Sequence, residues 1–296
     1  MVKAAAKKFN WKLYTKIVLT VLGVTWIFNQ IDVNEVGKYL RDISILVAIG
    51  CIVIYNLSKA FCALRLNLFF KQDGVIISEK ENLKLYYKGM FYNMLLPGGI
   101  GGDGYKGYYL RQTLQVPIKN LVRPILWDRT TGAVSIVIMI FGLANFQPSI
   151  PDQLAIQIFL ICSPVIIYFV SMVVSNIIVP AYKNVFHYTS MLSFLNQVLQ
   201  GIIVTLILYG LHVPLTLLDD YLLVFFVSSL ATILPITLGG IGIREFVFIK
   251  AAEISGIDQD TAVALSVLFF GITVLSALAG SIVKLNVQRP IIESSN

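Results

Sequence analysis

Charged residues are scarce in this sequence. Only 13% of its 296 residues are Asp, Glu, Lys or Arg, whereas 57% are hydrophobic. Four runs of at least 22 residues carry no charge, at 130–151, 153–182, 221–243 and 261–283. Each run exceeds the roughly 20 residues that a helix needs to cross a bilayer. This scarcity of charge excludes an ordinary soluble domain, and it predicts an all-α, polytopic helical membrane bundle.

The sequence also has few of the side chains that commonly bind metals or perform catalysis. Its three cysteines (Cys51, Cys62 and Cys162) lie in apolar runs without metal or disulfide spacing, and His187 and His212 are far apart. We therefore predict no catalytic residue, no metal site and no cofactor, and we expect that the protein is not an enzyme. The net charge of +7 comes from short segments between apolar runs, which is typical of the positive-inside rule rather than of a nucleic-acid site.

The basic residues predict how the chain crosses the membrane. Five lysines precede the first apolar run, and Lys284 and Arg289 follow the last, so both termini should be cytoplasmic in a cell inner (cytoplasmic) membrane. Segment 65–88 is predicted to be a cytoplasmic loop, with Lys59 and Arg65 as interfacial anchors. A single domain over 1–296 would contain about six full spans, at 13–31, 43–64, 126–145, 154–180, 191–211 and 261–283.

Two further apolar segments are interrupted by proline and glycine. The first runs into Pro97 and then has five glycines within positions 98–104. The second runs into Pro235, reaches three glycines within 239–242 and then meets Arg244 and Glu245. Such breaks free backbone N–H and C=O groups, which is tolerated at membrane depth only inside protein or beside a watery cavity. We predict two re-entrant broken-helix hairpins, eight segments in all, with full crossings as the alternative.

The two breaks resemble each other and predict an internal repeat. Gly98-Gly99-Ile100-Gly101 recurs as Gly239-Gly240-Ile241-Gly242, and a Leu-Pro pair precedes each tetrapeptide. Basic residues flank the first break and acidic residues flank the second, so the hairpins should open from opposite sides of the membrane. The halves of this inverted repeat would be approximately 43–145 and 191–284, as in many transporters. The simpler alternative is two helix-packing motifs of small residues.

At these motifs the sequence resembles the lysylphosphatidylglycerol synthase transmembrane (flippase-like) family. The resemblance covers most of the chain. Its first part is Asn93, Leu96 to Gly99, Gly101-Gly102-Asp103 with Lys106 and two tyrosines, then Asp128-Arg129 and Gly132; its second part is Pro235, Thr237, Gly239 to Gly242 and Arg244-Glu245. It implies a protein that moves a lipid between leaflets. No counterpart of the family's cytosolic synthase domain follows Val283, and Lys106 stands where arginine is common.

We therefore expect a lipid translocase (flippase) for a phosphate-bearing lipid, such as an aminoacyl-phospholipid or a polyprenol-linked or glycolipid. Helix N-termini and cations would bind the phosphate, and Asp103, Asp128 and Glu245 would meet a cationic headgroup, couple to protons or neutralise their neighbours. The candidate substrate-binding residues are Asn93, Gly98, Gly99, Gly101, Gly102, Asp103, Lys106, Arg111, Asp128, Arg129, Thr237, Gly239, Gly240, Gly242, Arg244 and Glu245.

Other interpretations stay open from the sequence alone. The adjacent pairs Asp128-Arg129 and Arg244-Glu245 could be internal ion pairs that hold helix ends. The protein could instead transport small anionic solutes, or be an integral membrane transferase acting on lipid phosphates. Membrane lipids are the expected partners, with no nucleic acid; the oligomeric state stays open, a homodimer included.

Overall fold

All regular secondary structure in the described part of the chain is helical. A computed structural model describes residues 41, 43–95, 101–147, 153–233 and 242–287, and no strand occurs among them. The helices are α3 (Ile45–Gln72), α4 (Glu79–Leu95), α5 (Gly101–Leu114), α6 (Lys119–Ala144), α7 (Leu154–Ile178), α8 (Phe186–Gly210), α9 (Leu218–Ala231), α10 (Ile243–Ser255) and α11 (Gln259–Ile282), with short 3-10 turns at Pro180–Val185 and Leu215–Leu217. The predicted all-α class is confirmed.

Five stretches of the described chain are long and apolar enough to cross a membrane: α3, α6, α7, α11, and α8 together with its preceding 3-10 turn. They correspond to five of the six predicted full spans; the first, 13–31, lies outside the described residues. The helices beside the two breaks are shorter, since α4, α5, α9 and α10 have 17, 14, 14 and 13 residues. Each is below the roughly 20 residues of a full crossing.

Two predicted boundaries were wrong because a helix continues into a charged segment, and a third was wrong because α8 begins at Phe186 rather than 191. The first is the end of α3, which continues to Gln72 rather than ending at 64. The predicted loop 65–88 therefore contains the last turns of α3 and the first half of α4. The second is α6, which begins at Lys119 instead of 126. In both places a helix extends beyond its apolar run into a segment with charged residues, whose partners lie elsewhere in the fold.

Local sequence signals begin and end several of these helices. Ser44 caps α3, because its hydroxyl accepts a hydrogen bond from the Leu46 amide at 3.3 Å. Asp258 does the same for α11, where its carboxylate accepts from the Thr261 amide at 2.7 Å. Gly256 ends α10 in the left-handed conformation with a φ of 73°, which glycine adopts without steric cost.

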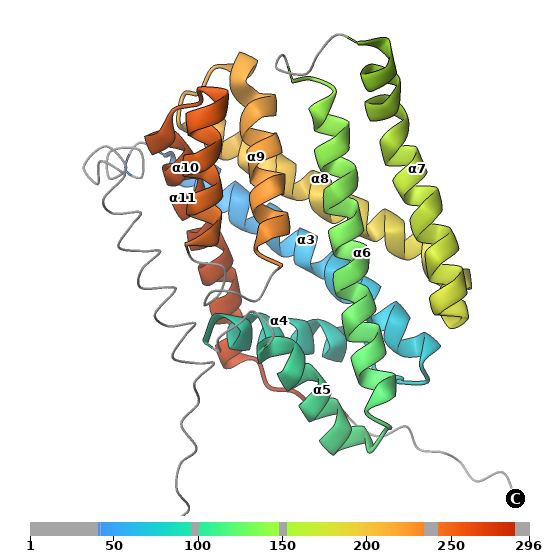
Figure 1. The fold of residues 1–296 in the computed structure, drawn as a ribbon. Helices are drawn as coiled ribbons and strands as arrows, with labels where there is room; N and C mark the ends of the chain where they lie inside the picture. Colours follow the sequence, from blue (N-terminus) through green and yellow to red (C-terminus); the bar gives the residue numbers. More distant parts are fainter. Residues whose placement is uncertain (1–40, 42, 96–100, 148–152, 234–241, 288–296) are drawn as a thin grey trace, which may run out of the picture.

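The helix contacts follow a regular exchange. Helices α3 and α8 lie side by side through the centre of the bundle (Figure 1). Helices α3, α4, α5 and α6 can be exchanged with α8, α9, α10 and α11, respectively. After this exchange, every pair of contacting helices among the eight is again a contacting pair. The pairs are α3–α4 with α8–α9, α4–α5 with α9–α10, α5–α6 with α10–α11, α3–α6 with α8–α11, α4–α11 with α9–α6, and α3–α11 with α8–α6. This is the pattern that an internal two-fold repeat of four helices would produce; α7 packs outside these eight helices, on α6.

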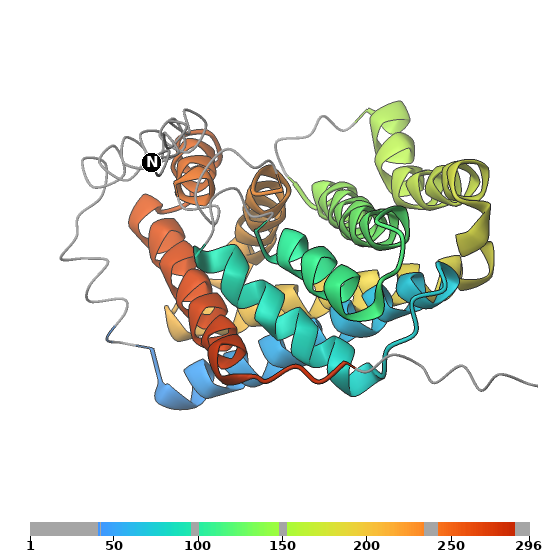
Figure 2. The same ribbon diagram turned by 90° about the horizontal axis from the view of Figure 1, so that it is seen from below.

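The larger apolar core lies among α3, α8, α9, α10 and α11, and a smaller one joins the C-terminal part of α3 to α4, α5 and α6. Figure 2 shows α4 between α5 and α11, above α3. Two glycines allow the closest approaches. A Cβ on Gly102 would overlap the Gly89 carbonyl of α4, and a Cβ on Gly280 of α11 would overlap the Tyr87 carbonyl. Both faces of α4 are therefore held by backbone contact.

Candidate substrate-binding site

The first break joins two antiparallel helices. The Asn93 side chain near the end of α4 accepts a hydrogen bond from the Gly102 amide at the start of α5, at 2.7 Å. Further along, the rings of Tyr92 and Tyr105 stack with centroids 4.2 Å apart. The predicted substrate ligand Asn93 therefore closes the hairpin through its carbonyl oxygen. The Gly102 amide, expected to meet an anion, already has a partner within the protein.

Asp103 is the centre of a buried ionic cluster. Its carboxylate accepts from the Lys106 ammonium at 3.1 Å, one turn further along α5, and its other oxygen accepts from the Arg129 guanidinium of α6. Asp103 and Lys106 are 9% and 5% exposed. The Lys106 ammonium also lies 4.3 Å from the centre of the Tyr86 ring on α4. Three helices thus meet at one carboxylate beside the break.

A second ion pair involves Asp128, the residue of α6 directly before Arg129. The Arg65 guanidinium of α3 donates to Asp128 at 2.7 Å and to the Ser193 hydroxyl of α8 at 2.7 Å. Arg65 is 4% exposed, so its predicted role as an interfacial anchor was wrong. In the sequence it follows an apolar run of span length, which is why it looked like the end of a crossing. Only the extension of α3 to Gln72 puts it inside the bundle.

Asp128-Arg129 and Arg244-Glu245 are adjacent in the sequence, but the two members of each pair do not form an ion pair with each other. Asp128 bonds to Arg65 and Arg129 bonds to Asp103, so neighbours in sequence turn toward different helices. Successive residues on a helix point about 100° apart and do not face each other. These charges connect α3, α5 and α6, and the interpretation as a local ion pair is wrong for Asp128-Arg129.

The second break ends in a capped helix. The Glu245 carboxylate accepts from the Gly242 amide at 2.8 Å and from the Ser266 hydroxyl of α11 at 2.7 Å. Gly242 has a φ of 90°, a conformation that favours glycine. Glu245 therefore fixes the start of α10 against α11. The Gly242 amide, like that of Gly102, is bonded within the protein.

Arg244 lies against aromatic rings instead of a carboxylate. Its guanidinium carbon is 4.8 Å from the ring centre of Phe269 and 5.3 Å from that of Phe225. No carboxylate of the described residues lies within ion-pair distance of it, the neighbouring Glu245 included. Rings stabilise a cation through their π faces and leave its N–H donors available to an anion.

Helix α3 links the surroundings of the two breaks. Tyr55 packs edge-to-face on Phe269 at 6.0 Å, beside Arg244, and the Lys59 ammonium lies 4.5 Å from the Tyr55 ring centre. Lys59, predicted to be an interfacial anchor, has no carboxylate partner among the described residues. Arg65 follows six residues later on the same helix. Sequence analysis missed Lys59 and Arg65 as site residues, and their only signal was a cation at the end of a long apolar run.

The remaining candidates fall into two groups. Arg111 is exposed in the last turn of α5, outside the ionic cluster, and Gly101 is the first residue of α5. Five of the candidate residues lie outside the described part of the chain: Gly98, Gly99, Thr237, Gly239 and Gly240.

The family follows from comparison with known sequences. The sequence model of the lysylphosphatidylglycerol synthase TM region matches residues 13–187 and 181–280. The chain belongs to this family. A UPF0104 membrane protein of Methanocaldococcus jannaschii is 27% identical over 231 residues, which cover 69% of this chain and 97% of that protein. Together with the apolar helices, the match makes this family member a multi-pass membrane protein.

Proposed function

We propose that this protein is a lipid translocase that moves a phosphate-bearing lipid between the leaflets of its membrane. The observation that carries the proposal is an excess of positive charge beside the two breaks, between helices apolar enough to span a bilayer. Around the first break, Arg65, Lys106 and Arg129 face Asp103 and Asp128, three cations against two carboxylates. An ionisable group at membrane depth is costly and by default functional.

The second break adds cations that no described carboxylate neutralises. Arg244 and Lys59 approach the same aromatic pair, Tyr55 and Phe269, from α10 and α3. A phosphate brings the negative charge that this region lacks, and an arginine can bind two of its oxygens at once. In this proposal the headgroup passes along α3, from the ionic cluster of the first break to the cations of the second, while the hydrocarbon chains stay in the bilayer.

The test is a flip assay with the purified full-length chain in liposomes. Fluorescent phosphatidylglycerol, phosphatidylcholine and a polyprenyl phosphate are each placed in both leaflets, and a membrane-impermeant quencher reports exchange between leaflets. We expect faster exchange of at least one lipid than in protein-free liposomes. Exchange no faster for all three would refute the proposal, and uptake of free phosphate without lipid exchange would instead identify a solute transporter.

One pair of variants tests the role of Arg244. A hydrogen bond to a charged group contributes about 1.5–3 kcal/mol, and about 1.4 kcal/mol is tenfold in a rate or equilibrium. Arg244→Met should therefore slow exchange roughly tenfold to a hundredfold. Lys250→Met on the same helix is the matched control, since Lys250 forms an exposed pair with Glu253 and should leave exchange unchanged. Equal rates for the two variants would contradict the role of Arg244.

A further inference from the structure

We propose that a pocket between α6, α7 and α8 binds one acyl chain of a glycerophospholipid, with Ser175 donating a hydrogen bond to its ester carbonyl. This inference rests on the proposed function and names where the lipid's hydrocarbon chain is held. The pocket has a volume of about 730 Å³, within the range of small-molecule sites. Its walls include Trp127 and Val134 of α6, Val170 of α7 and Phe194 of α8.

The mouth of the pocket opens where only lipid can reach it. Val165, Val170 and Val174 of α7 line the pocket and are 57%, 54% and 42% exposed, so the wall continues onto the outer surface of the helix. Helices α6, α7 and α8 are all apolar enough to span the membrane. At that depth the surrounding medium is hydrocarbon, and no charged side chain lines the pocket among the described residues.

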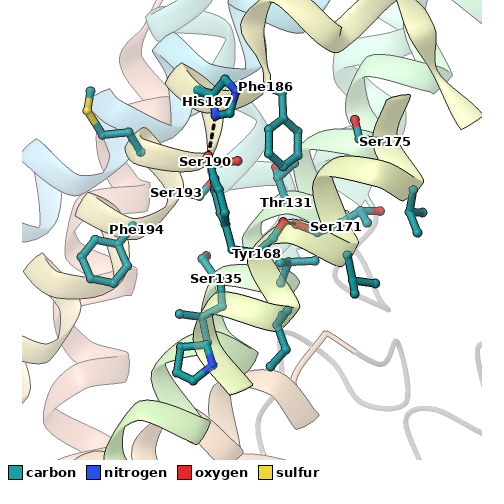
Figure 3. A pocket seen from close by; sticks show the side chains of 18 of the residues that line it. Thr131, Ser135, Tyr168, Ser171, Ser175, Phe186, His187, Ser190, Ser193 and Phe194 are labelled. Carbon is teal, nitrogen blue, oxygen red and sulfur yellow. Dashed lines mark hydrogen bonds between the residues drawn. The ribbon is translucent and has the colours of Figure 1, made fainter. Parts of the chain in front are cut away.

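Among the buried hydroxyl groups that line the pocket, that of Ser175 is distinct. Thr131, Ser171 and Ser193 each donate to a carbonyl of their own helix, at 3.0–3.1, 2.7 and 2.8 Å, so their protons are already used. Ser175 is 1% exposed and its hydroxyl has no hydrogen-bond partner. A buried hydroxyl without a partner is unfavourable, and a ligand carbonyl in the pocket would satisfy it. Figure 3 shows Ser175 beside the Phe186 ring, on the side away from His187.

The pocket has a polar end and an apolar end. At the polar end the Tyr168 hydroxyl and His187 Nδ1 are 2.5 Å apart, and the Phe186 ring lies between this pair and Ser175 (Figure 3). Pro164 lines the pocket eleven residues before Ser175, about 16 Å away along α7 at 1.5 Å per residue. A hydrocarbon chain with a carbonyl at one end matches this arrangement, whereas an isoprenoid phosphate carries no carbonyl for Ser175.

The pocket also adjoins the ion pair between Arg65 and Asp128. Ser193 lines it and accepts a hydrogen bond from Arg65, which is paired with Asp128 behind the wall. A lipid whose chain occupied the pocket would place its phosphate within the same part of the bundle as these charges. The chain site and the proposed headgroup path therefore belong to one lipid.

Trp127 provides a probe within the pocket wall. The full-length chain with Trp11→Phe and Trp26→Phe keeps Trp127 as its single tryptophan. In nanodiscs of phosphatidylglycerol with brominated acyl chains, bromine in the pocket quenches its fluorescence. Val134→Phe and Val170→Phe fill the pocket and should each abolish most of the quenching. Val173→Phe is the matched control, because Val173 is 50% exposed on the same helix and does not line the pocket.

A second measurement keeps the inference testable if a filled variant fails to fold. A phosphatidylglycerol with a diazirine in one acyl chain should cross-link to residues of α6, α7 and α8 that line the pocket. An ether-linked analogue lacks the carbonyl and should cross-link less than the ester. Ser175→Ala should remove this difference between the two lipids.

The outcomes separate this inference from the proposed function. Quenching that Val134→Phe and Val170→Phe leave unchanged, or cross-links spread evenly over the outer surface of α7, would overturn the chain site. Ester and ether lipids that cross-link equally to the unaltered chain would overturn the role of Ser175. Quenching and cross-linking as expected, without lipid exchange in the flip assay, would keep the chain site and refute the translocase.

Discussion

The pair between Arg65 and Asp128 predicts a large and specific loss of stability. The side chains are 5% and 11% exposed and their atoms are 2.7 Å apart. Asp128→Asn removes the negative charge with almost no change in shape, and it leaves the Arg65 guanidinium buried and uncompensated. Breaking one partner of a buried pair costs about 3–5 kcal/mol. We expect Asp128→Asn to lower the free energy of unfolding by that amount.

The double variant Arg65→Met/Asp128→Leu separates the charge from the contact. Replacing both members of a buried pair by apolar residues is often neutral for stability. It should therefore recover most of the loss caused by Asp128→Asn. Because its ionic cluster has lost a cation and a carboxylate, it should still exchange lipid more slowly than the natural chain. Stability and transport would then respond differently to the same two positions.

An exposed pair in the same region is the control. Lys71 and Glu79 are 2.5 Å apart, but their side chains are 43% and 45% exposed. Such a pair contributes about 0–1 kcal/mol, so Glu79→Gln should change stability little. Detergent titration in mixed micelles, followed by circular dichroism, measures all of these variants. If Asp128→Asn cost no more than Glu79→Gln, or if the double variant were as unstable as the single one, the reasoning from burial would be refuted.

Three other predictions can be tested with variants. Gly102→Ala should lower the melting temperature, because its Cβ would overlap a carbonyl of α4, whereas Gly104→Ala, with no atom within 4 Å, should be neutral or stabilising by up to about 1 kcal/mol in the same thermal scan. Lys106→Met should slow lipid exchange, and Lys106→Arg, which keeps the cation beside Asp103, should retain more activity in the flip assay. Single cysteines at Gly99 and Gly240, in a chain without native cysteines, should react with impermeant reagents from opposite sides; labelling from one side would contradict the inverted repeat.

The sequence predicted the apolar helices because a helix that crosses the hydrocarbon core of a bilayer needs about 20 consecutive apolar residues. Runs without charge became α7 and α11 with ends within two residues of those expected. The prediction failed where helices carry charge, at the end of α3 and over α4, because a helix satisfied by partners in three dimensions needs no local apolar pattern.

The sequence likewise identified some residues of the candidate site and missed others. Asp103, Lys106 and Arg129 were identified from the motif, and the structure brings all three together. Arg65 was missed because its partner Asp128 is 63 residues away, a relation that spacing along the chain does not reveal. For the same reason the adjacent Asp128-Arg129 pair suggested a contact that helical geometry prevents.

The close contacts of α4 limit how this part of the protein can move. On one side Gly89 meets Gly102 of α5, and on the other the Tyr87 carbonyl meets Gly280 of α11. With backbone touching backbone on both sides, there is no layer of long side chains that could change rotamers to absorb a displacement. Rotation of α4 must carry α5 and the C-terminal part of α11 with it. Helices α4 and α5 and the C-terminal part of α11 therefore move as one unit.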